Sequence, residues 1–536
     1  MTDNMIKKTA RFYLPLLIIL LISCSMQDSD VELIRKGPRT VAVQLDQYQN
    51  IKYVSSTSGS DSQGEGSRQS PWETVIFALS RISDANEQNR YAVLVSAGSY
   101  GNRTIRMKEY IDLYGGFNDK DWGRDIDANY TEFHGNEKRR IMFGADFSRV
   151  DGFVFREGTI RGKGAAIYGK GVSPAITNNV FKNNKTLGPK PWNPKYRHEI
   201  TNDGGAVYFE YGSSPVIENN LFIDNSTENG RGAALAFHSR CNGKITNNVF
   251  LKNIAGLDDP LRSSDGGAVS VFDWSSPLVE NNLFLNNKAL AENDAGGMFV
   301  ALWSSPIIRK NIFVGNVCTD DAGALFVGGQ EHRYDAPLDP LPPKDQFYIA
   351  VEENLFIGNS NPSRNSGVTR MTMESRGVFR KNVTAYNTGI YFQRSEVLIE
   401  DNLMLDHFRL VETKKGLNPS VIRNNIIWGD FLITTEADIH DNSIKGGYEN
   451  NSNIPPQLIQ DGFQVIPDAV YCPLRSYTTT LFLSNGTFPV NGLVNRVVKA
   501  GDKWSVIKSN DEKHVEVWGD FFQRIDFTIL PTYRLK

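Results

Sequence analysis

A short segment with a central asparagine recurs along the middle of the chain and restricts its fold more than any other feature. Strong copies read SPAITNNVFKNN, SPVIENNLFIDN and SPLVENNLFLNN. Ten copies share one asparagine: Asn179, Asn220, Asn248, Asn282, Asn311, Asn354, Asn382, Asn402, Asn425 and Asn442. Such self-similarity indicates a solenoid, in which each repeat buries its apolar face only by stacking on its neighbours.

The repeats carry strand patterns rather than helix patterns. A second β-prone run, opened by glycine, precedes each strong copy, as in GGAVYFEY from Gly204 and GGAVSVFD from Gly266. No helical period of apolar residues occurs here, which disfavours solenoids that contain helices. The sequence therefore predicts an all-β fold, a right-handed parallel β-helix solenoid of at least ten coils.

The shared asparagine is interpreted as structural. Asparagine tolerates a left-handed backbone, and its side-chain amide can bond the asparagine of the next coil. Asn is also as abundant as Gly, of which the chain has 46. We therefore expect a ladder of stacked amides at one bend of the solenoid, and not a row of ligands.

The solenoid is expected to have a cap at one end and a separate module after the other. Residues 50–160 are interpreted as an N-terminal cap with the first coils, because an amphipathic helix opened by Pro71 can shield the open end from edge pairing. Residues 161–445 hold the β-helix repeats. Residues 446–536 are interpreted as a linker and a small antiparallel β module, packed on or following the C-terminal end of the solenoid.

Residues 1–23 have the parts of a bacterial lipoprotein signal peptide. Three basic residues precede an apolar run, Phe12 to Ile22, that is too short to span a bilayer. The run ends in LISC, which resembles a lipobox, and the resemblance implies cleavage before Cys24 and lipidation of Cys24. Residues 24–49 are then a tether, and the protein is expected on the outer membrane or cell surface of a Gram-negative bacterium. The alternative is an ordinary signal peptide with a chance cysteine.

The combination of YVS, SPWETVIFAL, LYGGF, DGF and the repeated SSPxIxNNxF and GGA motifs resembles bacterial right-handed β-helix repeat proteins of the pectate-lyase-like superfamily. It is also similar to the repeats of polymorphic outer-membrane proteins. The resemblance covers roughly residues 50–445 and implies the β-helix fold. Such relatives include polysaccharide lyases, hydrolases and adhesins, so the fold alone does not assign a function.

Charge and motifs disfavour several other classes. The 58 Lys and Arg residues face 61 Asp and Glu residues, which disfavours a nucleic-acid-binding protein. Cys241, Cys318 and Cys472 form neither a disulfide framework nor a metal-binding spacing. The glycine pairs open strands rather than helices, so no phosphate-binding loop is present. The GHG and RIK motifs of polygalacturonase-type β-helix hydrolases are missing, which disfavours a glycoside hydrolase.

A column of charged residues precedes the glycine-opened strands, directly or, for Asp294 and Asp321, with one alanine between. It contains Asp203, Arg231, Asp265, Asp294 and Asp321, which stack at about 4.8 Å per coil in a parallel β-helix. One interpretation is structural, with Arg231 relieving repulsion between stacked carboxylates. The other is a metal site in which Asp203, Asp265 and Asp294 bind Ca²⁺, a cation that takes oxygen ligands. Ca²⁺ is thus the one candidate cofactor.

Long insertions beside this column carry basic and aromatic residues. Aromatic rings stack on sugar faces and arginine pairs with uronate or sulfate, so we expect an extended polysaccharide as the partner along the coil flank. A solvated loop that covers the flank is the alternative. Trp274 and Trp303 share a turn position and form either a sugar platform or a packed seam. The candidate substrate-binding residues are Trp192, Tyr196, Arg262, Trp274 and Trp303.

A lyase that eliminates across a uronic acid needs a cation for the carboxylate, a base at C5 and an acid for the leaving oxygen. The candidate catalytic residues are Arg231, His198, Arg197 and His238. The sequence therefore predicts a surface protein that binds extended polysaccharide, with lyase activity on uronic-acid glycans as the candidate reaction. A non-catalytic adhesin or structural surface protein is the alternative.

Overall fold

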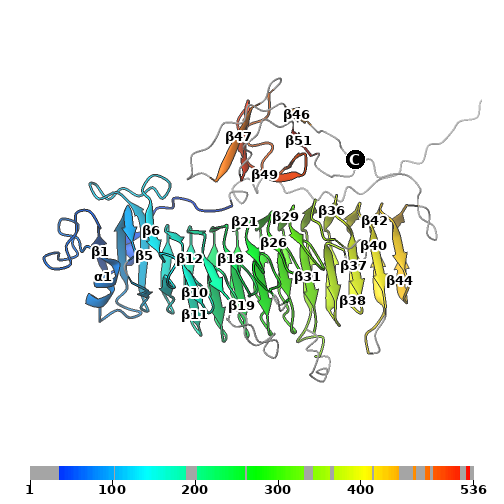
Figure 1. The fold of residues 1–536 in the computed structure, drawn as a ribbon, viewed down its shortest axis with the longest axis horizontal. Helices are drawn as coiled ribbons and strands as arrows, with labels where there is room; N and C mark the ends of the chain where they lie inside the picture. Colours follow the sequence, from blue (N-terminus) through cyan, green and yellow to red (C-terminus); the bar gives the residue numbers. More distant parts are fainter. Residues whose placement is uncertain are drawn as a thin grey trace, which may run out of the picture.

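The chain forms a long solenoid with a small module lying along its side (Figure 1). The computed structural model describes residues 36–101, 103–188, 202–259, 262, 264–330, 342–362, 367–412, 416–445, 463–465, 477–482, 487–519 and 527–530. Within these residues the solenoid is built from four parallel sheets, here named A to D, and the module from one antiparallel sheet. The prediction of a parallel β-helix with at least ten coils is confirmed.

Sheets A and B run almost the whole length of the solenoid. The strands of sheet A are β1 (Asn50–Val54), β2 (Tyr91–Ser96), β5 (Ile111–Phe117), β8 (Arg149–Asp151), β12 (Ala175–Thr177), β16 (Val216–Glu218), β20 (Lys244–Thr246), β24 (Leu278–Glu280), β28 (Ile307–Arg309), β32 (Ile349–Glu352), β35 (Arg376–Arg380), β38 (Glu396–Glu400), β41 (Ser420–Arg423) and β44 (Ala437–His440). The strands of sheet B are β4 (Ile105–Arg106), β7 (Met142–Phe143), β11 (Ile167–Lys170), β15 (Val207–Glu210), β19 (Leu235–His238), β23 (Val269–Phe272), β27 (Met298–Val300), β31 (Leu325–Gly328), β34 (Thr369–Thr372), β37 (Ile390–Gln393), β40 (Phe408–Val411) and β43 (Phe431–Ile433).

Sheet C holds the strands that follow the shared asparagine, and sheet D is a shorter sheet beside it. The strands of sheet C are β3 (Gly98–Tyr100), β6 (Thr131–His134), β9 (Val154–Arg156), β13 (Val180–Lys182), β17 (Leu221–Ile223), β21 (Val249–Leu251), β25 (Leu283–Leu285), β29 (Ile312–Val314), β33 (Leu355–Ile357), β36 (Val383–Ala385), β39 (Leu403–Met404), β42 (Ile426–Ile427) and β45 (Ser443–Ile444). The strands of sheet D are β10 (Thr159–Arg161), β14 (Lys185–Leu187), β18 (Ser226–Thr227), β22 (Ile254–Ala255), β26 (Lys288–Ala289) and β30 (Val317–Cys318).

Identical side chains stack on one another inside the solenoid because each strand pairs in register with the same strand of the next coil. The Phe181 and Phe222 ring centroids are 4.7 Å apart, and those of Phe284 and Phe313 are 4.4 Å apart. These rings are completely buried. Burial of apolar surface between coils, at roughly 25 cal/mol per Å², is the main force that holds the stack together.

The shared asparagines form the expected ladder. The side-chain oxygen of Asn282 accepts hydrogen bonds from both the backbone N–H and the side-chain amide of Asn248, at 2.9 and 3.1 Å. A second ladder, which we did not predict, runs five residues further along each coil, from Asn184 to Asn387. It ends in a carboxylate, Asp406, which accepts from the Asn387 amide at 2.7 Å.

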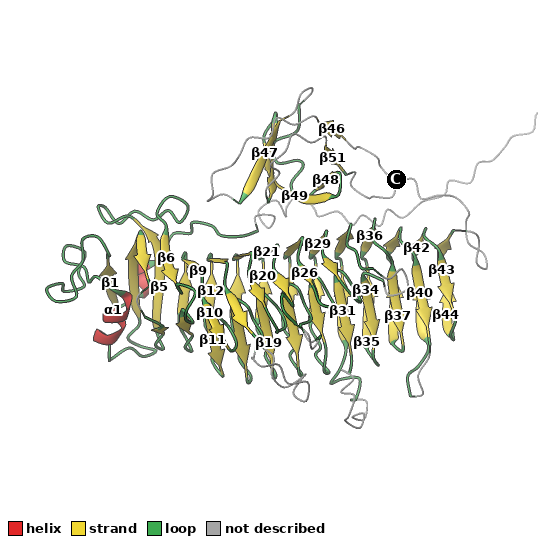
Figure 2. Ribbon diagram, viewed as in Figure 1, coloured by secondary structure: helices red, strands yellow, loops and turns green. Residues whose placement is uncertain are grey.

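A short helix closes the N-terminal end, as expected. It is α1 (Val75–Arg81), the one α-helix among the described residues (Figure 2). The Thr74 hydroxyl caps it by accepting from the N–H of Phe77 at 3.1 Å. The helix starts after the predicted Pro71 because Trp72 forms a bridge with Val54 of β1.

The part of the expected tether that the structure describes lies against the coils. The N–H of Gly37 donates to the Asn247 carbonyl at 3.1 Å, and Arg39 Nη2 donates to Asn219 Oδ1 at 2.6 Å. The segment from residue 36 to the short 3-10 turn Leu45–Gln47 therefore runs along the outside of sheet A. No described helix is long and apolar enough to cross a bilayer.

The terminal module packs on the flank of the solenoid. Its strands are β46 (Phe463–Val465), β47 (Thr478–Phe482), β48 (Val497–Ala500), β49 (Lys503–Asn510), β50 (His514–Trp518) and β51 (Phe527–Ile529). Val506 and Trp518 share one apolar cluster with Val249 and Val314 of sheet C, and Asn286 Nδ2 donates to the Trp504 carbonyl at 3.0 Å. The antiparallel module is confirmed, but its expected packing on the C-terminal end is wrong for the described residues. The apolar outer face of sheet C, with Val249, Leu251 and Val314, shares its buried cluster with the module.

Candidate functional site

The charged column exists, and backbone amides of the next coil satisfy its carboxylates. Arg231 N donates to Asp203 Oδ1 at 2.8 Å, Asp294 N to Asp265 Oδ1 at 2.9 Å, and Asp321 N to Asp294 Oδ1 at 2.9 Å. The residue after each member has a positive φ, namely Gly204 (66°), Gly232 (62°), Gly266 (79°), Ala295 (59°) and Ala322 (63°). The column therefore marks a left-handed turn, which favours glycine. These contacts support the structural interpretation of the aspartates.

Arg231 and His238 lie against the same aromatic ring. The Arg231 guanidinium carbon is 4.1 Å from the centroid of the Phe272 ring, and the His238 imidazole stacks on that ring at 5.2 Å. His238 Nδ1 is 2.8 Å from the Ser239 hydroxyl, which donates to Asp273 Oδ2 at 2.9 Å. Arg231 is only 2% exposed, whereas His238 is half-buried.

Burial sets the protonation state of His238. Desolvation lowers its pKa below the usual range, Asp203 opposes that shift, and Lys163 and Arg231 reinforce it. The imidazole is therefore neutral at pH 7 and has a lone pair that can accept a proton. This is the state that a general base requires.

Glu210 lies beside His238 and is held by neighbours from its own strand and from the preceding coil. Strands β15 and β19 pair Glu210 directly with His238. Glu210 accepts hydrogen bonds from Tyr168 at 2.5 Å and from Tyr208 at 3.2 Å, and Lys163 Nζ is 3.5 Å away. Both tyrosine pKa values are raised, first by burial and then by nearby carboxylates, so both hydroxyls remain protonated donors. These five side chains are named the Glu210 cluster.

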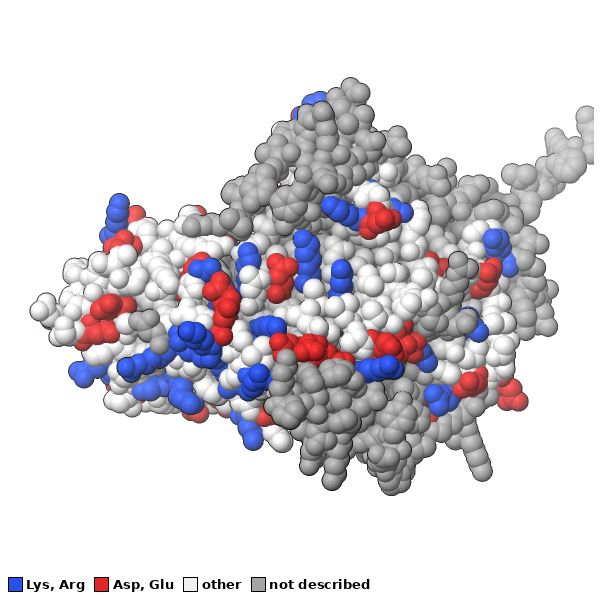
Figure 3. All heavy atoms as spheres, in the orientation of Figure 1, with Lys and Arg blue, Asp and Glu red and all other residues white. Residues whose placement is uncertain are grey.

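A basic and aromatic surface adjoins this cluster on the first coils of sheet B. The Arg140 guanidinium carbon lies 4.7 Å from the Phe143 ring centroid and 4.6 Å from that of Tyr168. Lys163 Nζ is 4.7 Å from the Tyr208 ring centroid. The basic–aromatic patch is defined as Arg106, Arg140, Phe143, Lys163, Tyr168, Lys170 and Tyr211. Figure 3 shows lysine and arginine side chains gathered over the lower side of the first coils.

The sequence contains a signal for this surface that our alignment of coils did not use. The run GAAIYGK from Gly164 has the form of the other glycine-opened strands. Strands β11 and β15 pair Tyr168 with Tyr208 and Lys170 with Glu210. Extending the alignment by this one coil would have identified Tyr168 and Lys170 as neighbours of the predicted site.

The other predicted binding residues do not join the cluster. Trp303 is 3% exposed and packs edge-on against Phe347 at 5.1 Å, so burial rules out its use as a sugar platform in this arrangement. Trp274 is half-buried and packs against the main core. Arg262 is exposed and forms an ion pair with Glu292. The predicted residues Trp192, Tyr196, Arg197, His198 and Cys24 lie outside the described residues.

Three acidic residues form a group that the sequence did not predict. Within the described residues, the carboxylates of Asp294, Asp320 and Asp321 lie within 4.8 Å of one another, whereas Asp203 and Asp265 are not in this group. The Arg370 guanidinium forms an ion pair with Asp321 and hydrogen-bonds Gln393 at 2.8 Å. A Ca²⁺ ion here would compete with an arginine that already compensates the negative charge. Of the predicted metal ligands, only Asp294 belongs to the group.

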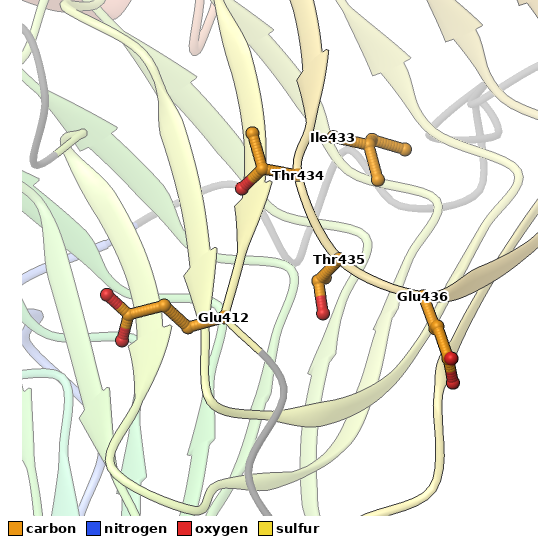
Figure 4. A pocket seen from close by; sticks show the side chains of 5 residues that line it. All are labelled: Glu412, Ile433, Thr434, Thr435 and Glu436. Atoms are coloured by element: carbon orange, nitrogen blue, oxygen red, sulfur yellow. The ribbon is translucent and has the colours of Figure 1, made fainter.

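A surface depression near the last coils shows no arrangement for hydrolysis. Glu412, Ile433, Thr434, Thr435 and Glu436 line it. The two glutamates point in different directions and do not face a common point (Figure 4). A glycoside hydrolase needs two carboxyl groups that flank one bond.

Comparisons with known proteins agree with this architecture. Residues 126–317 match the family model of the right-handed β-helix region. Together with the parallel sheets, this match establishes a right-handed parallel β-helix, as the sequence predicted. No curated protein matches the chain.

Several solved structures also match the chain, at low sequence identity and low TM-score. Pectate lyase Pel9A is 11% identical, with 77% of this chain and 83% of that chain covered and a TM-score of 0.34. A tailspike protein mutant of E. coli bacteriophage HK620, in complex with a pentasaccharide, is 8% identical, with 85% and 89% covered and a TM-score of 0.25. A GH136 lacto-N-biosidase from Eubacterium ramulus is 11% identical, with 73% and 68% covered and a TM-score of 0.24.

Proposed function

We propose that this protein binds an extended, negatively charged polysaccharide across the basic–aromatic patch. One observation carries the proposal: Arg106, Phe143 and Tyr168 stand in a single column, one from each of three successive coils, and the buried Tyr208 continues that column. Cationic groups lie over the rings of this column at every step. The coils repeat at about 4.8 Å, which is close to the length of one sugar residue in an extended chain.

The chemistry of the patch suits an anionic glycan. Arginine binds carboxylate and sulfate through two parallel hydrogen bonds, and lysine supplies a mobile point charge. The whole chain has a net charge of −3, so this positive surface is a local exception rather than a general property. A local positive field attracts an acidic polymer and weakens as salt screens it.

Binding to polygalacturonate and alginate tests the proposal. The double variant Arg106→Ala/Lys170→Ala removes two exposed cations, and we expect about tenfold weaker binding and a smaller dependence on salt. Lys244→Ala/Lys288→Ala is the matched control, since it removes two exposed lysines from sheets A and D. Equal losses in both double variants, or no binding by the intact protein at low salt, would overturn the proposal.

Elimination is the reaction that the Glu210 cluster best supports. In such a step a base takes the C5 proton, a double bond forms between C4 and C5, and the C4 oxygen leaves with a proton from an acid. The neutral imidazole of His238 supplies the base, and Lys163 supplies a cation for the uronate carboxylate. The predicted partners Arg231, Arg197 and His198 stay candidates for the remaining roles.

A specific observation favours the alternative of a binding protein without catalysis. Tyr208 is 0% and Arg231 2% exposed, so neither reaches a polymer on the surface in this arrangement. The two functions separate in one assay, in which the protein is incubated with a panel of uronic-acid polysaccharides, with and without Ca²⁺, and absorbance of the unsaturated product is followed. Product that disappears in His238→Ala supports a lyase. Binding without product on any substrate supports an adhesin or a structural surface protein.

We also propose that the protein is anchored in the outer membrane or on the cell surface by a lipid on Cys24. The supporting pattern is the basic segment, apolar run and LISC box of residues 7–24. Cys24→Ser is expected to move the protein from the membrane fraction to the soluble fraction when it is expressed in a Gram-negative host. Mass spectrometry of the mature N-terminus provides the direct check, and an unmodified cysteine there would contradict the proposal.

A further inference from the structure

A groove on the outer face of sheet A is a second candidate site, on the sheet that follows sheet B and its basic–aromatic patch along each coil. It has a volume of about 620 Å³, within the range of about 300–1,000 Å³ that is common for small-molecule sites. Strands β5, β8, β12 and β16 form its floor, and residues 41–48 form one wall. Every residue that lines the groove belongs to the described part of the chain.

The floor of the groove is rigid because its two buried carboxylates are fully engaged. Asp112, 4% exposed, accepts from the Tyr48 hydroxyl at 2.6 Å and from Arg90 at 3.1 Å. Asp151, also 4% exposed, pairs with Arg124 and accepts from Thr177 and Asn178 at 2.5 and 2.7 Å. The floor thus holds its shape without a ligand, which lowers the entropic cost of binding one.

One polar group in the groove lacks a partner within the described residues. Asn178 is 6% exposed and lines the groove. Its amide nitrogen donates to Asp151, but its Oδ1 accepts no hydrogen bond from described residues. This oxygen is itself buried, so a ligand hydroxyl could bond to it only after neighbouring side chains move.

The aromatic ring of Phe147 lies at the rim of the groove, and its backbone adopts an unfavourable conformation. Phe147 is 57% exposed and has a φ of 53°, a region that bulky side chains rarely adopt. Its ring lies flat on Tyr110, with centroids 5.0 Å apart and planes 7° apart. Arg90 Nη2 fixes the backbone by donating to the Phe147 carbonyl at 3.0 Å. The structure therefore holds an apolar face at the edge of a polar groove.

The charges that line the groove balance. Arg90 and Arg124 are paired with Asp112 and Asp151, and the half-buried side chains of Arg149 and Glu218 add one charge of each sign. A charged ligand gains no net attraction in such a place. A molecule with many hydroxyls can donate to Glu218 and accept from Arg149, while its apolar face covers Phe147.

From this arrangement we infer that the groove binds an uncharged oligosaccharide. An aromatic platform beside planar polar side chains matches a sugar ring, which has an apolar face and a hydroxyl edge. The site is distinct from the basic–aromatic patch in both position and charge. It gives this protein a second carbohydrate specificity that does not depend on the proposed binding of anionic polymers.

The test uses the intact protein and four uncharged probes: cellotetraose, xylotetraose, mannotetraose and maltotetraose. Calorimetry or a glycan array should detect binding of at least one of them, and Phe147→Ala should weaken that binding about tenfold. Phe147→Trp should retain it. Tyr386→Ala is the matched control, because Tyr386 is 55% exposed and has a φ of 59°, yet lies outside the groove.

The outcomes separate this inference from the proposed function. Loss of tetrasaccharide binding in Phe147→Ala, with polygalacturonate binding unchanged, supports the groove as an independent site. The inference fails if none of the four probes binds, if Phe147→Ala and Tyr386→Ala have equal effects, or if Arg106→Ala/Lys170→Ala abolishes binding of the uncharged probe. Equal melting temperatures of the variants verify that folding is intact.

Discussion

Asn282→Ala is expected to lower the free energy of unfolding by about 4 kcal/mol, because it removes four hydrogen bonds from a completely buried position. The Asn282 amide donates to the Ile245 carbonyl at 2.8 Å and to Asn311 Oδ1 at 3.0 Å. Its oxygen accepts from the backbone and side chain of Asn248 at 2.9 and 3.1 Å. The substitution leaves donors of Asn248 and an acceptor of Asn311 buried without these partners.

Urea denaturation followed by circular dichroism measures this loss, and hydrogen exchange locates it. The backbone N–H of Asn248 donates to Asn282, so its exchange should accelerate in the variant by more than that of amides at the far ends of the solenoid. Asn86→Ala is the control, because Asn86 is exposed, and its cost should stay below about 1 kcal/mol. A loss below about 1 kcal/mol in Asn282→Ala would show that the ladder is not a stabilising element.

Asp406→Asn is expected to stabilise the protein at neutral pH by about 3 kcal/mol. Burial raises the pKa of Asp406 from 3.8 to about 6, although hydrogen bonds from Asn387 lower it. Because the folded-state pKa lies above the unfolded value, the native state favours the protonated form. Its contribution to stability is complete below about pH 4 and is lost as the pH rises through about 6. A shift of about two units corresponds to about 3 kcal/mol, and an asparagine avoids this loss because it is never ionised.

The pH dependence distinguishes this effect from a general improvement in packing. The stabilisation by Asp406→Asn should be largest near pH 8 and should shrink toward zero near pH 4. Asp438→Asn makes the same change in charge on an exposed side chain and should have little effect at either pH. A stabilisation that does not vary with pH, or a destabilised variant near pH 8, would contradict the raised pKa.

The fold could be predicted because its repeat is written in local sequence. The shared Asn recurs in ten copies, and an aliphatic residue and Phe follow it in the first six; strands that pair in register bring these copies on top of one another. The second ladder also follows from the local sequence, because its members are the last asparagines of the strong copies. An alignment on both asparagine columns would have found it. The capping helix followed from the spacing of its apolar residues.

The candidate site was only partly predictable. Alignment of coils placed Arg231 in the aspartate column, and the structure confirms that column. Exposure could not be deduced in this way. The alignment does not show that Trp303 packs on Phe347 or that Arg231 lies against Phe272, because each contact depends on neighbouring turns.

The sequence by itself determined the solenoid, its register and the residues that share a column, because all three follow from short-range repetition along the chain. The tertiary structure alone decided where the module packs, which carboxylates meet, and where a groove opens. Residues 41–48 reach the wall of that groove, and Trp518 of the module joins the apolar cluster of Val249, only after the chain has folded back on the stack. These contacts join segments without a common repeat, so side-chain packing between them, rather than any local pattern, sets the surface on which ligands would bind.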